Sequence, residues 1–166
     1  MKNKISLAIA FTVLGMALCI SATASEAKPL KGAEKFHYDI EYIKSAGDGV
    51  STVDVYAYGK NKKEAWDSCE KCAIHGVIFK GYTGQGSYQS PLVKSASGYD
   101  DNFDFFNNFF DNGDYRRYVS GVVDGSHKVI KIKGGFKVKC VINVNVKMLR
   151  KHLEEAGIIK GLSSGF

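Results

Sequence analysis

The stretch NKKEAWDSCEKCAIHGVIFKG, residues 61–81, decides how this sequence is read. Asn61 is a residue type that commonly precedes a helix, and Glu64 follows at the spacing of a capping box. Gly81 can end a helix because glycine accepts the left-handed backbone that follows many last turns. The stretch therefore predicts a helix that begins after Asn61 and ends near Gly81.

The predicted helix carries small residues on one face. At 100° per residue, Cys69, Cys72 and Gly76 fall within about 80° of Ala65, and the charged residues of the stretch lie toward the opposite side. Small side chains let a helix approach a sheet closely, and a free cysteine commonly behaves as a small buried hydrophobe. The pattern therefore predicts that both thiols face the core.

The spacing of Cys69 and Cys72 leaves two chemical alternatives open. Thioredoxin-type redox pairs stand at a helix N-terminus, whereas Cys69 comes about two turns into this helix. A metal site would have to add His75 and Cys140 to the pair, and His75 points about 60° away from Cys72. The pattern favours packing over a thiol-redox enzyme or a metal-stabilised domain, and no cofactor is expected.

A disulfide is a further possibility for these cysteines. Cys140 lies on the apolar face of a predicted strand, where either Cys69 or Cys72 could meet it, and the sequence leaves the choice open. Closing a loop of about 70 residues would stabilise the fold by roughly 3–4 kcal/mol in the chain-entropy description. The third cysteine would remain a thiol.

The N-terminus, MKNKISLAIAFTVLGMALCISATASEAKPL, has the form of a secretory signal. A basic start, an apolar run and small residues before Ser25 predict a signal peptide over 1–24. The run is short for a membrane span, so no integral membrane protein is expected after cleavage. Cys19 raises the alternative of a lipid anchor, which the bulky Leu18 before it disfavours. Residues 25–34 are predicted to be a flexible lead-in to one domain over 35–166.

The charge of the chain is mildly basic. It has 23 Lys and Arg against 17 Asp and Glu, a net charge of +6, and loss of Lys2 and Lys4 with the signal would leave +4. The basic residues form short scattered clusters without a continuous stripe. Together with predicted export to the periplasm or beyond, this excludes nucleic acid as an expected partner.

Periodicity predicts an α+β domain, with an antiparallel sheet of about five strands and helices packed on one face, in the order ββα-loop-αβββα. Two alternating segments form a hairpin before the cysteine helix, and three more strands precede a final helix. The predicted elements are strands at 35–44 and 52–60, the helix at 61–81, a loop at 81–98, an aromatic helix at 101–112, strands at 115–123, 128–133 and 136–146, and a helix at 147–157.

Three segments carry candidate binding residues. The Gly- and Ser-rich loop 81–98 is long enough to be functional or disordered. The aromatic helix has a second phenylalanine row beside its core-facing row, although phenylalanine at helical spacing is typical of a core. The segment DYRRYV could bind acidic groups or could be an edge strand guarded by charge. The candidate residues are Tyr82, Tyr88, Phe105, Phe109, Arg116 and Arg117.

The stretch VDVYAYGKNKKEAWDSCEKCAIHGVIFKG, residues 53–81, resembles small secreted envelope proteins of unknown function from Bacteroides-type bacteria. It is similar, more distantly, to the strand–helix modules of curli-secretion and flagellar assembly proteins. The resemblance implies a structural or assembly part without a catalytic site, and its cysteines and phenylalanine row depart from those modules. We therefore expect a non-catalytic secreted or periplasmic interaction protein with a protein partner in the envelope.

Overall fold

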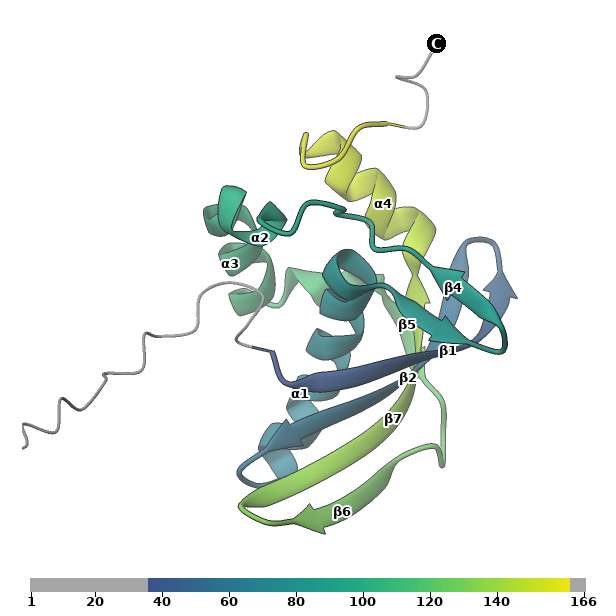
Figure 1. The fold of residues 1–166 in the computed structure, drawn as a ribbon, viewed down its shortest axis with the longest axis vertical. Helices are drawn as coiled ribbons and strands as arrows, with labels where there is room; N and C mark the ends of the chain where they lie inside the picture. Colours follow the sequence, from purple (N-terminus) through teal and green to yellow (C-terminus); the bar gives the residue numbers. More distant parts are fainter. Residues whose placement is uncertain (1–35, 162–166) are drawn as a thin grey trace, which may run out of the picture.

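The computed structural model describes residues 36–161. The predicted signal peptide and lead-in lie outside the described residues, as does the end of the C-terminal tail. The described part has an α+β fold, with four α-helices and a seven-stranded, mostly antiparallel open sheet (Figure 1). The predicted fold class is therefore confirmed, and the predicted number of about five strands is wrong.

The sheet has the strand order β4-β3-β1-β2-β7-β5, and β6 pairs with a second part of the β7 edge. All pairs are antiparallel except β1 with β3. The elements are β1 (Tyr38–Gly47), β2 (Val50–Gly59), α1 (Lys62–His75), the π-helical segment η2 (Gly76–Lys80), β3 (Tyr82–Gly84), β4 (Ser87–Gln89), α2 (Gly98–Asp101), α3 (Phe103–Asp111), the 3-10 turn η3 (Asp114–Tyr118), β5 (Val119–Val122), β6 (Lys128–Ile132), β7 (Gly135–Asn145) and α4 (Val146–Glu155).

The two additional strands lie in the segment predicted to be a loop. Residues 82–89 form the β3–β4 hairpin, and β3 joins the edge of β1 through Glu41 and Thr83. A Cβ at Gly84 would lie 1.9 Å from the Tyr42 carbonyl oxygen, so this close pairing requires glycine. Gly84 thus permits close packing of β3 against β1, whereas the sequence predicted that the glycines of this segment belong to a loop.

A second difference concerns the strand predicted at 115–123. Its first half forms η3, and the strand begins only at Val119. Tyr115 and Tyr118, three positions apart, are both buried. One turn of 3-10 helix places residues at this spacing on the same side, whereas an extended strand would place them on opposite faces.

The core forms where α1 crosses the central strands β2 and β7 (Figure 1). Every second pair of residues across these two strands points toward the helix, because alternate side chains share one face of a sheet. On this face of β2 and β7, seven residues are at most 1% exposed: Val53, Val55, Ala57, Val138, Cys140, Ile142 and Val144.

The predicted start of α1 is confirmed. The Asn61 side chain accepts a hydrogen bond from the Glu64 N–H at 2.9 Å, and the Glu64 carboxylate accepts one from the Lys60 N–H at 2.9 Å. At its other end, α1 continues directly into η2. The N–H of Gly81, the residue after η2, donates a hydrogen bond to the Gly76 carbonyl oxygen at 2.9 Å. Gly81 then leaves the helical path at a φ of 69°.

Small residues set how closely the helical path approaches the sheet. A Cβ at Gly76 would lie 2.7 Å from Ile40 Cδ1 and 3.1 Å from Tyr38 Cε2. At the other end of α1, a Cβ at Gly59 would lie 2.5 Å from the Ala65 nitrogen. The predicted close packing of a small-residue face is therefore confirmed.

We expect Gly76→Ala to lower the free energy of unfolding by about 1 kcal/mol. Overpacking against Ile40 should outweigh the roughly 1 kcal/mol by which alanine favours a helix over glycine. Urea denaturation would measure the loss. In an Ile40→Val background, which lacks the obstructing Cδ1, the same substitution should be less harmful. An equal loss in both backgrounds would contradict this account of the packing.

Candidate functional site

The three described cysteines are buried, as predicted for the thiols of the helix. Cys69, Cys72 and Cys140 are 2%, 3% and 1% exposed, and all are free thiols in this structure. The Sγ atoms of Cys69 and Cys140 lie 2.6 Å apart. Cys72 instead lines a cleft between α1 and α3. Of the two pairings that the sequence left open, the structure brings Cys69 to Cys140.

The surroundings of the helix thiols favour their protonated forms. The hydrogen-bonded contact between Cys69 and Cys140, together with burial, raises the pKa of Cys69. Burial raises the pKa of Cys72 to about 12, although the nearby Lys71 cation acts in the opposite direction. Because the thiolate is the nucleophilic form of cysteine, neither thiol is activated for chemistry near neutral pH.

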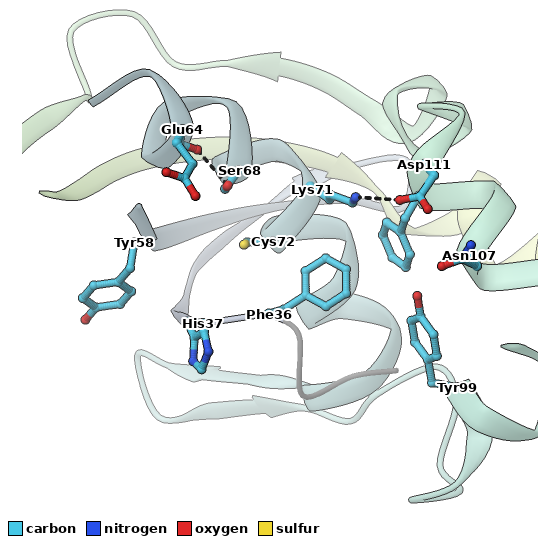
Figure 2. A pocket seen from close by; sticks show the side chains of 11 residues that line it. Phe36, His37, Tyr58, Glu64, Ser68, Lys71, Cys72, Tyr99, Asn107 and Asp111 are labelled. Atoms are coloured by element: carbon cyan, nitrogen blue, oxygen red, sulfur yellow. Dashed lines mark hydrogen bonds and ion pairs between the residues drawn. The ribbon is translucent and has the colours of Figure 1, made fainter. Parts of the chain in front are cut away.

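The cleft that Cys72 lines has a volume of about 290 Å³ (Figure 2). Its central cation, Lys71 Nζ, lies 3.3 Å from Asp111 Oδ1 and 5.6 Å from the centroid of the Phe36 ring. The hydroxyl of Ser68 donates to the Glu64 carbonyl oxygen at 2.8 Å. Lys71, Asp111 and Ser68 therefore already have partners within the protein, and the partner of the Ser68 hydroxyl is a backbone carbonyl and not a general base.

His75 lies behind this cleft in an aromatic cluster. Its ring is 3% exposed and stacks on Phe36 at a centroid distance of 4.0 Å. Tyr38 Oη lies 2.7 Å from His75 Nδ1, and Nε2 has no hydrogen-bond partner among the described protein atoms. Burial, with help from Lys80 and Lys71, lowers the pKa of His75 to about 3. The imidazole is therefore neutral at physiological pH.

Two of the candidate contact residues are core residues. Tyr82 is 4% exposed and donates its hydroxyl to Ser51 Oγ at 3.1 Å. Phe109 is 3% exposed, and its ring centroid lies 5.9 Å from that of Tyr118. Neither side chain can reach a partner at the surface, so their prediction as contact residues is wrong.

The other candidates differ in exposure. Tyr88, in the middle of β4, is 61% exposed. Phe105 is half-buried and packs on His152 at a centroid distance of 5.7 Å. Arg116 and Arg117 lie on η3, where each is near a carboxylate: Arg116 Nε is 3.7 Å from Glu70, and Arg117 Nη2 is 3.3 Å from Asp114. The structure does not gather these residues into one site.

The sequence predicts a strand at 128–133, and the structure has β6 (Lys128–Ile132) there, at the margin of the sheet (Figure 1), but the sequence did not single it out as a binding candidate. β6 pairs along one side with β7, and all five of its residues are exposed. Three of them are β-branched and apolar: Val129, Ile130 and Ile132, 42%, 38% and 38% exposed. The run KVIKIK could have indicated this, because its apolar residues fall on both faces of a strand.

The charge along this edge is uniformly positive. Within residues 36–161, no ion pair engages Lys128, Lys131 or Lys133. Lys128 stands directly opposite Lys139 of β7, whose ammonium is held by Asp54 at 2.6 Å. Like charges directly opposite each other destabilise a strand pair, so this arrangement is not explained by sheet stability.

The described residues contain no group of three His, Cys, Asp or Glu side chains that could hold a metal ion. None of their helices has the length and apolarity to cross a membrane. No protein-family model matches the chain, and no curated protein or solved structure does. The resemblance to envelope proteins therefore stays a prediction.

We expect the stability of the protein to fall when the pH drops below 6.5, because His75 resists protonation only in the folded state. Its folded pKa of about 3 lies below its ordinary value of 6.5, so the unfolded chain binds the additional proton between these values. From pH 6.5 to pH 5 the contribution of His75 should fall by about 2 kcal/mol.

Urea denaturation of His75→Gln at both pH values would measure this contribution. The variant should lack this part of the pH dependence, whereas His37→Gln, a change at an exposed histidine, should retain it. The same pH dependence in His75→Gln and the unaltered protein would show that His75 is not its source.

Proposed function

We propose that this protein is a non-catalytic interaction protein of the cell envelope that binds an extended, acidic segment of a partner protein along β6. The observation that carries the proposal is the exposed β6 edge, with Val129, Ile130 and Ile132 open to solvent. An edge strand presents unpaired N–H and C=O groups, onto which an extended segment can pair as an additional strand.

The lysines of the edge specify the chemistry of the partner. Lys128, Lys131 and Lys133 are interspersed with the apolar residues and lie on the same hairpin. A segment in which β-branched residues alternate with Asp or Glu would cover the apolar side chains and neutralise these charges. Lysines also protect edge strands from unspecific pairing, which would restrict this edge to acidic partners.

A second copy of this chain fits the edge less well. No acidic residue occurs between Asp124 and Glu154, a region that includes all of β6 and β7. Two β6 edges side by side would bring six lysines of the two hairpins together without a carboxylate from either strand. Charge complementarity therefore favours a different protein as the partner.

The absence of catalysis in this proposal is supported by the chemistry of the cleft and thiols. Burial raises the pKa of Cys72 to about 12, and Lys71 is already paired with Asp111. The envelope location is an expectation from the N-terminal signal pattern. Together they support a binding role more strongly than the alternative of a thiol-redox enzyme.

We expect a fluorescent peptide of alternating valine and glutamate to bind the protein, and Lys128→Glu/Lys131→Glu/Lys133→Glu to weaken binding at least about tenfold. The variant replaces attraction by repulsion along the edge. Fluorescence anisotropy would measure the affinity. N-methylation of alternate peptide bonds in the probe should also weaken binding, because pairing along an edge needs the N–H groups of the probe.

The matched control is Lys44→Glu/Lys94→Glu/Lys160→Glu, which changes the net charge equally at exposed positions outside β6. It should bind the peptide nearly as well as the unaltered protein. Equal weakening in the two triple variants would show unspecific attraction to positive charge. Indifference to N-methylation would exclude strand pairing, and either result would overturn the proposed use of β6.

Thiol reactivity separates this proposal from the redox-enzyme alternative. At pH 8 we expect iodoacetamide to modify Cys72 of the folded protein at least about 100-fold more slowly than it modifies glutathione, because the buried thiol is almost entirely protonated. Mass spectrometry of the alkylated peptides over time would measure the rate. Rapid modification in folded protein would instead favour an activated thiol, and modification in urea provides the unfolded reference.

A further inference from the structure

Two sulfur atoms meet at the centre of the core. Cys69 lies in the middle of α1, and Cys140 lies in the middle of β7, 71 positions later in the chain. Their Sγ atoms are 2.6 Å apart. Both side chains are almost fully buried, so the packing of α1 against β7 holds the two sulfurs in contact.

We propose that Cys69 and Cys140 are joined by a disulfide when the protein folds in an oxidising compartment, and that Cys72 remains the free thiol. A disulfide bond is about 2.05 Å long, so the sulfurs need to approach by only about 0.5 Å. Cys72 is the less suitable partner, because it opens onto the cleft between α1 and α3. Cys69 and Cys72 do not suit each other, because residues three apart on a helix hold their Cβ atoms about 5–6 Å apart.

The cross-link needs an oxidant, for which a low-molecular-weight disulfide such as oxidised glutathione suffices. One protein thiolate attacks a sulfur of oxidised glutathione, which forms a mixed disulfide and releases the first glutathione thiolate. The second cysteine then attacks the protein sulfur, forms the Cys69–Cys140 bond and releases the second glutathione. The two protein protons pass to the two glutathiones, so the protein is oxidised by two electrons and oxidised glutathione is reduced.

The sulfurs are reachable from one side. A small cavity of about 110 Å³ is lined by both cysteines, with Trp66 and Val122 as apolar walls and Arg116 among its polar groups. Because both side chains are at most 2% exposed, oxidation is fastest while the protein folds and slow afterwards. The proposal concerns the core and is independent of the binding proposed for β6.

Peptide mapping tests the pairing directly. Trypsin places the three cysteines on separate peptides, residues 64–71, 72–80 and 140–147. Protein refolded with reduced and oxidised glutathione, then blocked with N-ethylmaleimide and digested, should give peptide 64–71 linked to 140–147 and a blocked thiol on 72–80. Three blocked thiols, or a link between 72–80 and 140–147, would overturn the proposal.

Variants provide an independent readout. Cys72→Ala should keep the cross-link, and Cys69→Ala and Cys140→Ala should each lose it. Adding a reductant should lower the melting temperature of the unaltered protein and of Cys72→Ala by about 10 °C, because a loop of this length is released. The melting temperature of Cys69→Ala should not respond to the reductant, and a response there would contradict the assignment.

Discussion

Helix α1 can lie close to the sheet only because the residues on its inner face are small. Ala65, Cys69, Cys72 and Gly76 leave room for the side chains of β1, β2 and β7, and a single added Cβ at Gly76 would meet Ile40. This spacing brings the helix sulfurs into the core and seals Val53, Val55 and Ile142 beneath the helix. The rest of the described fold is arranged around this contact, with the aromatic residues of α3 filling the space at the C-terminal end of α1.

The cleft at the edge of that contact illustrates why a cavity with polar residues need not be an active site. Its lysine is paired with Asp111, its serine hydroxyl is bonded to the backbone, and its thiol is held protonated. The nearby imidazole of His75 is neutral and enclosed by aromatic rings. Groups that would be reactive in water are here either paired or desolvated, so the more open surface of β6 provides the better candidate for function.

The parts of the fold that the sequence predicted are those in which local chemistry and burial agree. Asn61 and Glu64 define the start of α1 by their own hydrogen bonds, and apolar side chains alternate with polar ones along β2 and β7 because the apolar face of each strand lies in the core. The β3–β4 hairpin was missed because its glycines serve a close approach to β1 that only the tertiary structure reveals. Tyr82 and Phe109 were misread for a related reason: an aromatic residue in a turn-rich or short helical segment gives no local sign of which neighbour covers it.

The two short strands along the outer edge of β7, β5 and β6, differ in how much they contribute to the core. Val119 and Val122 of β5 pack on the core, whereas β6 contributes no buried residue. The core therefore stays closed whatever the sequence of β6 is. Substitutions in that hairpin can accumulate in related lineages with little loss of stability, so the partner recognition proposed for β6 can diverge in evolution while the rest of the architecture is retained.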